Sequence, residues 1–580
     1  MPMNARPVDR LAIAIAQLNP IVGDVAGNAA KVRAARTQAS DADLILFPEL
    51  FIAGYPPEDL VLKPAFQAAC RAAIEDLARE TGQGGPAMLV GTPWVENGKL
   101  YNAVALLDGG RIAALRFKVD LPNYGVFDEK RVFAVGPMPG PVNFRGVRIG
   151  IPICEDIWGP EPAECIAETG GEILLVPNGS PYRRGVVDQR LSVSVARVTE
   201  TRLPLLYTNQ VGGQDELVFE GASFVLNADA SMAVQLPAFK ECVVTTHWVR
   251  EPDGWRCESG PLAALDPQDK TDYAVCVLGL RDYVNKNGFP GVVLGLSGGI
   301  DSALVAAMGV DALGRDRVRA VMLPYKYTSE ESFADAAAVA SALGIRYDIV
   351  PIESAVKGLE QALAPVFEGL KRDVTEENLQ ARARGTILMA LSNKFGSMVM
   401  TTGNKSEMST GYATLYGDMN GGFNPIKDLY KTEVFRLSEL RNRWKPDGAL
   451  GPDGVVIPQN IITKPPTAEL RENQKDQDSL PPYEILDQIL ERLVEQEQPI
   501  ADIIAAGFDP GIVTRVDRML NLAEYKRRQA APGVKVTLRG FGRDRRYPIT
   551  NKFRDPGTPL PKPDTTLVNN IAARSEAFDF

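Results

Sequence analysis

The sequence predicts an α/β protein with two domains. A chain of 580 residues is too long for a single hydrophobic core. Residues 11–248 show mostly strand patterns with a few helices between them, whereas residues 291–400 alternate between strand and helix. Between these regions, proline, glycine and charged residues interrupt the periodicity. We therefore expect one domain at residues 1–250, a linker at 251–272 and a second domain at 273–580.

The composition is typical of a globular protein, with 45% hydrophobic and 23% charged residues. The formal net charge of −10 argues against a general nucleic-acid binder. No apolar run reaches ~18 residues, so we expect no membrane span. The amino end shows no apolar signal region after its charged residues. These features predict a cytoplasmic protein with neither nucleic acid nor membrane as a partner.

The number and spacing of the histidine and cysteine residues limit the kinds of catalytic and metal site that the chain can form. The six cysteines contain no CxxC pair, so neither a zinc site nor a thioredoxin motif is predicted. The single histidine, His247, lies in the strand-like run VVTTHWV and is expected to be a packed strand residue. Any Ser-His-Asp or Cys-His arrangement would depend on it. The sequence therefore favours chemistry that needs no histidine.

The first half is expected to form successive strands, two longer helices and closing hairpins. The strands are expected at 11–19, 43–50, 87–95, 101–109, 112–119, 147–154, 172–180 and 204–212, the helices at 27–42 and 188–201, and the hairpin strands within 224–237 and 242–249.

Three polar residues follow predicted strands of this half: Glu49, Lys118 and Cys154. Taken singly, a strand-end Glu or Lys is usually solvated and a strand Cys is usually buried. Brought together, they would form a coherent site. An ammonium group lowers the pKa of a nearby thiol, and a carboxylate in hydrogen-bond reach can take the thiol proton. The ammonium group could also stabilise the oxyanion of a tetrahedral intermediate.

The local sequences around these residues, FPEL, FKVDLPNYGVFDEKRVF and ICEDIW, resemble the three signatures of the nitrilase (carbon–nitrogen hydrolase) superfamily. The resemblance covers roughly residues 10–250 and implies an αββα sandwich. It assigns Glu49 as general base, Lys118 as oxyanion stabiliser and Cys154 as nucleophile. It also implies glutamine-binding residues, which are Tyr124, Glu129 and Ser180.

One position departs from that pattern. Many relatives carry a basic residue six positions after Ser180, where this chain has Val186. We expect the missing contact to come from Arg183 or Arg184.

The second half is organised around the stretch GVVLGLSGGIDS, at residues 291–302. A buried strand, two glycines and a helix start present free backbone N–H groups to phosphate oxygens. Ser297 and Ser302 can donate hydroxyl groups, and Asp301 can hold a metal ion that bridges phosphates. The motif lacks the lysine of a Walker loop and the spacing of a dinucleotide fold. It resembles the SGGxDS loop of the N-type ATP pyrophosphatases, which split ATP between the α and β phosphates.

The remaining elements of this half predict a doubly wound parallel sheet, with ligands at the carboxyl ends of its strands. Beyond Gly411 we expect long irregular stretches, at 416–435 and 462–490. Strands are expected at 292–296, 317–324, 347–352 and 397–404, and helices at 271–288, 303–314, 329–344, 353–367 and 377–396.

The chain as a whole is similar to the family of bacterial glutamine-dependent NAD synthetases, at SGGIDS, ENLQARARG, TTGNKSE, PIKDLYKTEVF, KPPTAEL and YKRR. The resemblance implies a carbon–nitrogen ligase that takes glutamine, ATP and deamido-NAD, uses Mg²⁺, and assembles as a homo-oligomer. The ATP site would contain Gly295, Leu296, Ser297, Gly298, Gly299, Ile300, Asp301, Ser302, Thr402, Lys431 and Thr467. The deamido-NAD site would contain Asn378, Glu407 and Lys526, and the metal ligands would be Asp301 and Glu407. Glu407 thus has two implied roles, which the sequence leaves open.

Two other interpretations remain open at this point. The acceptor acid could differ from deamido-NAD, or the second half could be a nucleotide-sensing module that regulates an amidase. Residues 526–554 hold ten Lys and Arg residues against one acid, Asp544. This basic segment is either a solvated face or a site for a polyanionic dinucleotide.

Overall fold

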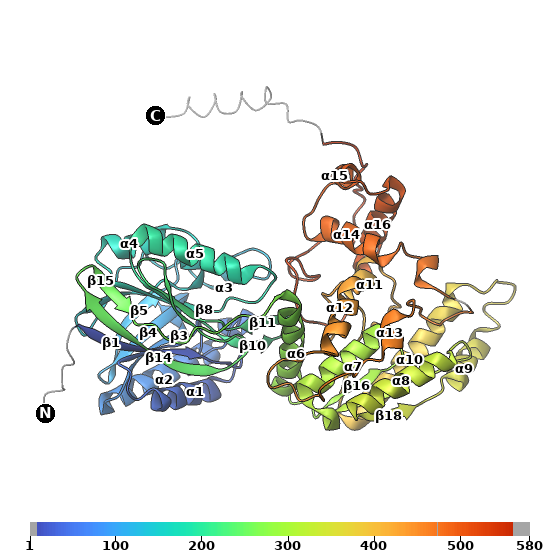
Figure 1. The fold of residues 1–580 in the computed structure, drawn as a ribbon, viewed down its shortest axis with the longest axis horizontal. Coiled ribbons are helices and arrows are strands. Elements are labelled where there is room, and N and C mark those ends of the chain that lie inside the picture. The colour runs from blue at the N-terminus through green and yellow to red at the C-terminus, as the bar shows by residue number, and fades with distance from the viewer. Residues whose placement is uncertain (1–8, 473, 561–580) are drawn as a thin grey trace.

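The computed structural model describes residues 9–472 and 474–560, so parts of both predicted domain ranges, at residues 1–8, 473 and 561–580, lie outside the described residues. The first half contains two main sheets, which lie on the left of Figure 1. One sheet has the order β15 (Gly254–Cys257), β14 (Cys242–Glu251), β1 (Arg10–Gln17), β2 (Leu44–Leu46), β3 (Ala87–Glu96), β4 (Lys99–Asp108) and β5 (Arg111–Phe117). The other has the order β13 (Met232–Gln235), β12 (Phe224–Leu226), β9 (Leu205–Asn209), β8 (Ile173–Asn178), β7 (Val147–Gly150) and β6 (Val142–Phe144).

The two sheets pack face to face, with helices on both outer faces. Ile13 and Leu89 of the first sheet share an apolar core with Leu175 and Leu206 of the second. Helices α1 (Val25–Gln38) and α2 (Pro64–Glu80) cover the outer face of the first sheet. Helices α4 (Glu161–Glu168) and α5 (Val186–Thr201) cover the outer face of the second. The αββα sandwich expected from the sequence is therefore confirmed.

The stretch between the halves contains more regular structure than its composition indicates. Strand β15 pairs antiparallel with β14, and α6 (Gln268–Lys286) begins three residues before the helix expected at 271. The alternation in Gly254–Cys257 buries Trp255 and Cys257 and leaves Arg256 exposed, which is the pattern of an edge strand. Four residues are too few for this alternation to stand out among the surrounding glycines and prolines.

The second half is built on a four-stranded parallel sheet in the order β18 (Arg346–Ile349), β17 (Val318–Met322), β16 (Val292–Gly295) and β19 (Met398–Met400). Val292 and Leu294 face a core shared with α7 (Ile300–Leu313), whereas Val293 faces α9 (Glu353–Leu363) and α10 (Val374–Phe395). Because both faces are covered, the two neighbouring strands β16 and β19 are short and apolar, whereas the edge strand β18 (RYDI) is polar and partly exposed. This confirms the doubly wound parallel sheet. The other helices next to it are α8 (Glu330–Leu343), α11 (Lys405–Thr410), α12 (Lys431–Arg441) and α13 (Gln459–Thr463).

A small helical cluster forms where the sequence predicted irregular structure. It contains α14 (Tyr483–Val494), α15 (Ile500–Ala505), α16 (Pro510–Leu522) and α17 (Glu524–Arg527). Leu486, Ile489, Leu490 and Leu493 of α14 pack into this cluster. Their helical spacing was hidden by the prolines that precede Tyr483, so the expectation of an irregular stretch through residue 490 was wrong.

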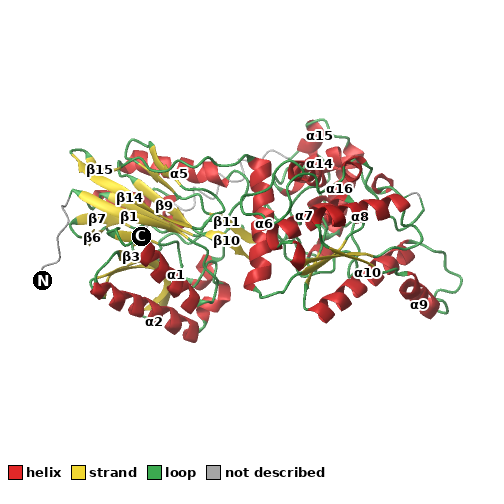
Figure 2. Ribbon diagram, turned by 60° about the horizontal axis from the view of Figure 1, so that its bottom comes forward, coloured by secondary structure: helices red, strands yellow, loops and turns green. Residues whose placement is uncertain are grey.

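The two halves share an apolar core at their junction. Strands β10 (Val211–Gln214) and β11 (Leu217–Glu220) lie beside α6, between the two halves (Figure 2). Val211 and Val218 belong to the same buried cluster as Val275 of α6 and Leu294 of the parallel sheet. Asn19 and the backbone of Gly213 also donate hydrogen bonds to Asp282 of α6, both at 2.7 Å. These contacts fix one half against the other.

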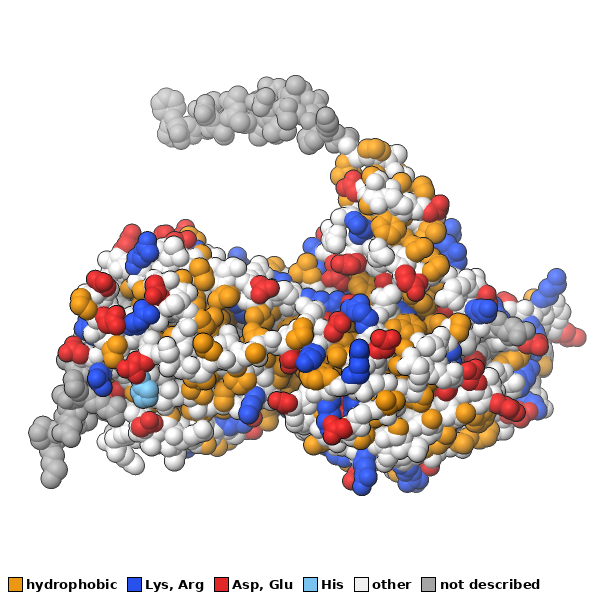
Figure 3. Space-filling model, viewed as in Figure 1, with side chains coloured by type: hydrophobic (Ala, Val, Ile, Leu, Met, Phe, Trp, Pro, Cys, Tyr) orange, Lys and Arg blue, Asp and Glu red, His pale blue; other side chains and the backbone are white. Residues whose placement is uncertain are grey.

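The visible surface mixes both signs of charge. On the face shown in Figure 3, Lys and Arg side chains are interspersed with Asp and Glu. Within the described part of the chain, no helix is both long and apolar enough to cross a membrane.

Replacing Arg441 by alanine should destabilise the second half by about 3 kcal/mol, because it leaves a buried charge without its partner. Arg441 Nε and Nη2 lie 2.6 and 2.8 Å from the carboxylate of Asp311, and the hydroxyl of Tyr273 donates to the same carboxylate at 2.6 Å. The free energy of unfolding from urea titration measures the effect. The exposed Arg443→Ala variant is the control, and a loss below about 1 kcal/mol in Arg441→Ala would contradict the prediction.

Candidate functional site

The carboxylates and amine predicted to act on glutamine lie in direct contact. Lys118 Nζ, just after β5, is 2.7 Å from Glu49 Oε1 and 2.9 Å from Glu129 Oε1. Lys118 and Glu49 are fully buried and Glu129 nearly so. The thiol of Cys154 is buried beside them, near enough for the charges of Glu49 and Lys118 to act on its pKa. Segments that are far apart in the sequence thus meet at one end of the two sheets.

The charges in this site depend on one another. Burial opposes the charged form of Lys118, but the two carboxylates outweigh it and raise the pKa of Lys118 well above its ordinary value. Burial, and then the negative charge of Glu49, raise the pKa of the Cys154 thiol. Before substrate binds, the cysteine is therefore a neutral thiol, and Lys118 stays cationic between two carboxylates.

The backbone at Cys154 is held in an uncommon conformation. Cys154 has φ of 49° and begins a short 3₁₀ helix, Cys154–Ile157. Asp156 holds this turn, since its carboxylate accepts hydrogen bonds from the backbone N–H groups of Ile153, Val119 and Asp120 at 2.8–2.9 Å. Left-handed backbone at a non-glycine residue is often found at active sites. Asp156 thereby ties the cysteine turn to the segment that carries Lys118.

Two neighbours of Glu49 were not predicted. Asn102 donates a hydrogen bond to Glu49 Oε1 at 2.7 Å, and the backbone N–H of Gly179 donates to Glu49 Oε2 at 2.9 Å. A Cβ at Gly179 would lie 2.7 Å from the ring of Tyr55, so only glycine allows this close approach. The sequence signal for Asn102 is weak, because it is a single polar residue beside an apolar run. Asp156 stands in the acidic turn EDIWGPEP, which does not indicate the backbone groups that it binds.

The three expected glutamine-binding residues lie around this site and differ in their exposure and in their hydrogen-bond partners. Tyr124 is 53% exposed at its mouth, and its hydroxyl lies 2.9 Å from Glu155, the residue after the cysteine. Glu129 belongs to the buried ion-pair group. Ser180 is buried, and its hydroxyl accepts a hydrogen bond from Arg190 Nε at 2.9 Å.

The arginines near Ser180 differ from the sequence expectation. Val186 packs into the apolar core at the junction of the halves, where a basic side chain would be buried without a partner. Arg184 is committed to Asp272 and Glu433 of the second half, so the expectation that it replaces the usual basic contact was wrong. The arginine that contacts Ser180 is the buried Arg190, which lies one turn further along α5.

The phosphate-binding motif lines an open pocket of about 310 Å³ in the second half. This pocket gathers ten of the eleven residues predicted to bind ATP, together with Glu407: Gly295, Leu296, Ser297, Gly299, Ile300, Asp301, Ser302, Thr402, Lys431 and Thr467. It lies at the carboxyl ends of β16, β17 and β19, where a doubly wound sheet binds its ligands.

The remaining member of the motif, Gly298, lies on the side of the loop that packs against α8. It has φ of 81°, and a Cβ there would lie 2.4 Å from the carbonyl oxygen of Ser332 on α8. The hydroxyl of Ser297 accepts from Gly299 N–H, and that of Ser302 accepts from Ser297 N–H, both at 3.2 Å. Hydrogen bonds of its own serines therefore hold the loop in shape, and Gly298 allows it to pack closely against α8.

Two carboxylates and one ammonium face each other in this pocket. Lys431 Nζ contacts Asp301 and lies 3.9 Å from Glu407 Oε1. Burial, and then the charge of Asp301, raise the pKa of Glu407 well above its ordinary value. Within residues 9–472 and 474–560, no group of three or more acidic, histidine or cysteine side chains could hold a metal ion. Two protein carboxylates suit Mg²⁺, which keeps several waters and binds substrate phosphates.

The other two residues expected at deamido-NAD lie behind the pocket wall. Lys526 Nζ donates to the carbonyl oxygens of Gly411 and Ala413, both at 2.7 Å, and Asn378 accepts from the hydroxyl of Thr414 at 2.9 Å. Both therefore support a segment whose Ala413 lines the pocket.

Most Lys and Arg side chains of the basic segment 526–554 pair with carboxylates. The segment therefore does not form an open site for a polyanionic dinucleotide, which was one of the two interpretations of its sequence. Arg527 and Arg545 pair with Glu524, Lys535 with Asp544, Arg539 with Glu497, Arg543 with Glu58, and Arg546 with Asp128.

Comparison with known protein families matches each half separately. The carbon-nitrogen hydrolase family model matches residues 12–251, and the NAD synthase model matches residues 273–530. A carbon–nitrogen hydrolase joined to an NAD synthase defines a carbon–nitrogen ligase.

Relatives match both halves at once, and each is named a glutamine-dependent NAD(+) synthetase. The one from Rhodobacter capsulatus is 54% identical over 94% of this chain and 99% of its own length. The one from Thermotoga maritima is 43% identical over 94% of this chain and 100% of its own. The solved structure from Acinetobacter baumannii, in complex with ADP, has a TM-score of 0.74 and 43% identity over 94% of this chain and 99% of that one. The chain belongs to the family of glutamine-dependent NAD(+) synthetases.

Replacing Glu49 by glutamine should lower the pKa of the Cys154 thiol while slowing glutamine hydrolysis. The carboxylate of Glu49 raises that pKa, so its removal increases the thiolate fraction and should speed alkylation at pH 7 roughly three- to tenfold. Hydrolysis should fall roughly 100-fold or more, since the proton acceptor is lost. Iodoacetamide labelling of the Cys154 peptide across pH, followed by mass spectrometry, measures the first effect.

The thiol of Cys70 provides an internal control for this labelling. Burial raises its pKa to about 12, so its labelling should be unchanged by the substitution. A Cys154 thiol that labels more slowly in Glu49→Gln than in the wild type would contradict the electrostatic assignment.

Proposed function

We propose that the chain makes NAD from deamido-NAD in two linked reactions, with glutamine as the nitrogen source. The observation that carries the first reaction is the buried contact of Lys118 with Glu49 and Glu129 beside Cys154. The second reaction is supported by the pocket that gathers the glycine-rich loop, Asp301 and Lys431.

In the first reaction, Glu49 takes the thiol proton of Cys154 as sulfur attacks the carboxamide carbon of glutamine. The backbone N–H that follows Cys154 and the ammonium of Lys118 stabilise the oxyanion. Glu49 then gives its proton to the leaving amine, so ammonia departs and a thioester remains. Water, activated by Glu49, releases glutamate and restores the thiol. Tyr124 and Ser180 hold the substrate.

In the second reaction, the nicotinate carboxylate of deamido-NAD attacks the α-phosphorus of ATP, and pyrophosphate leaves. The adenylate that forms has AMP as its leaving group, and the lone pair of ammonia displaces it to give the amide. The backbone N–H groups of 297–302 bind phosphate oxygens, and Lys431 neutralises the leaving pyrophosphate. Asn378 and Lys526 support the pocket wall on the deamido-NAD side.

Asp301 and Glu407 would hold Mg²⁺, because both carboxylates face the pocket next to the phosphate loop. Bound there, the ion would neutralise charge on the polyphosphate and orient it for displacement. The position of Glu407 beside Asp301 favours the metal role over the dinucleotide role.

We also propose a homo-oligomer in the cytoplasm. Val366, Leu370 and Val374, in the segment that connects α9 to α10 and at the first residue of α10, are each more than 60% exposed, which supports contact with a second copy. All six cysteines are free, as expected in a reducing compartment. Light scattering of the purified chain tests the assembly.

Replacing Cys154 by alanine should abolish NAD formation from glutamine and retain formation from ammonium salts. The thiol is needed only to release ammonia, so supplied ammonia should bypass it. The partly exposed Cys165 offers a matched control, because Cys165→Ala should keep both activities. Equal loss of both activities in Cys154→Ala, measured by NAD and pyrophosphate release, would overturn the two-site scheme.

A further inference from the structure

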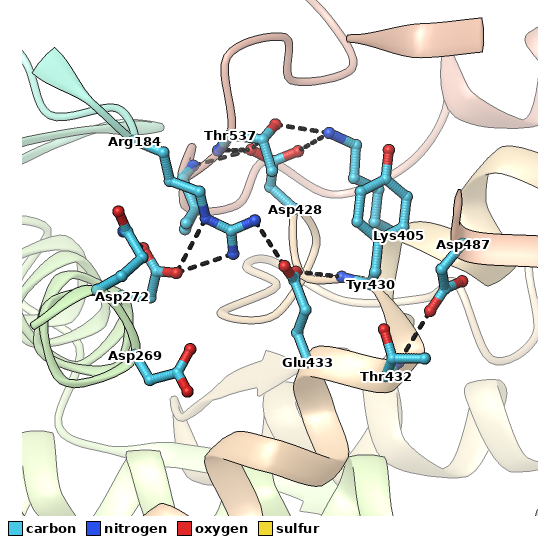
Figure 4. Close-up of polar contacts among 12 residues, drawn as sticks. Arg184, Asp269, Asp272, Lys405, Asp428, Tyr430, Thr432, Glu433, Asp487 and Thr537 are labelled. Atoms are coloured by element: carbon cyan, nitrogen blue, oxygen red, sulfur yellow. Dashed lines mark hydrogen bonds and ion pairs between the residues drawn. The ribbon is translucent and has the colours of Figure 1, made fainter. Parts of the chain in front are cut away.

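Arg184 forms an ion-pair bridge between the two halves. It follows the loop that carries Ser180, and its guanidinium lies between Asp272 of α6 and Glu433 of α12 (Figure 4). Its Nε and Nη2 lie 2.9 and 2.8 Å from Asp272 Oδ2, and Nη1 lies 2.5 Å from Glu433 Oε1. The side chains of Asp272 and Glu433 are only 1% and 8% exposed. Charged hydrogen bonds in such a place are strong and directional.

Glu433 connects this bridge to the ATP pocket. Its second oxygen accepts the backbone N–H of Tyr430 at 2.8 Å, which caps the start of α12. The next residue, Lys431, is the first of α12 and contacts Asp301 of the phosphate-binding loop. Arg184 is therefore separated from the ATP pocket by one carboxylate and one helical turn.

The loop after Ser180 is also held through its backbone. Arg184 N–H donates to the carbonyl oxygen of Val536 at 3.0 Å. Asp428 accepts the N–H groups of Val536 and Thr537 at 2.8 and 2.7 Å, and its other oxygen lies 2.8 Å from the fully buried Lys405 (Figure 4). A shift of this loop must therefore move Glu433 or break buried charged contacts.

We propose that Arg184 is a positioning residue that couples the glutaminase site to the ATP pocket, an inference that rests on the function proposed above. Coupling requires a contact that differs between two states of the protein. Here the contact is that of Lys431, which pairs with Asp301. The polyphosphate of ATP offers Lys431 a stronger negative partner, and the exchange moves the first turn of α12. Glu433, two residues further on, carries this movement to Arg184 and to the loop of Ser180.

The experiment compares glutamate release from glutamine with and without ATP and deamido-NAD. In the wild type, the two nucleotides should stimulate hydrolysis. In Arg184→Gln, the stimulation should fall roughly fivefold or more, while NAD formation from ammonium stays within about twofold of the wild type. The variant should fold, because Asp272 keeps hydrogen bonds from Tyr182 and Gln268 at 2.8 Å.

Two further variants distinguish coupling between the two sites from a purely structural role of the ion pair. Glu433→Gln removes the charge that Arg184 binds but can still accept from Tyr430 N–H, so it should lose stimulation in the same way. Arg543→Gln is the matched control, because Arg543 also pairs across the halves, with Glu58, and both side chains are partly exposed. It should keep the stimulation.

The outcomes are distinct. Unchanged stimulation in Arg184→Gln, equal loss in Arg543→Gln, or loss of ammonium-dependent synthesis in Arg184→Gln and Glu433→Gln overturns the coupling role. A wild type that makes NAD from glutamine without stimulation also overturns it. A wild type that makes no NAD overturns the proposed function itself.

Discussion

The buried cation of Lys118, held between Glu49 and Glu129, is the contact on which the first half depends. A charge without exposed surface is costly unless it is paired. Here the two carboxylates pair with the ammonium, while the Asn102 amide donates to Glu49 and the Tyr55 hydroxyl donates to Glu129. Under the proposed function, this arrangement lets a chain with one histidine activate a thiol. The carboxylate is already next to the cysteine, and the ammonium is already where negative charge would develop. The two facing sheets bring these segments together and exclude water from them.

The junction between the halves holds the second site in a fixed position relative to the first. Apolar residues of β10 and β11 share one core with α6 and the parallel sheet, so the two sites are not independent bodies joined by a flexible tether. Around this core lie charged contacts between the halves, such as Lys427 with Glu216 at 2.8 Å. Ammonia that is released into water becomes ammonium, which has no lone pair. A fixed geometry between the sites is therefore useful for a reaction that consumes ammonia.

The sequence predicted the fold class of both halves, because apolar runs and glycine-rich turns are local signals. It also singled out Glu49, Lys118 and Cys154 as one candidate site and the glycine-rich loop as a candidate phosphate site, since these lie in short motifs at strand ends. The contributions of Asp156 and Arg190 could not be predicted, because their partners are fixed only by the packing of distant segments. For the same reason the sequence, which offered Arg183 or Arg184 for the basic contact near Ser180, could not predict the bridge made by Arg184. Its partners, Asp272 and Glu433, come from another domain.

The central claim is that nitrogen released beside Cys154 is used in the ATP pocket of the same protein. The most direct measurement follows the isotope in NAD made from amide-¹⁵N glutamine in the presence of excess unlabelled ammonium. If the two sites are linked, the carboxamide of NAD should carry mainly ¹⁵N. A product in which ¹⁵N is diluted to its share of the total ammonia would contradict the account.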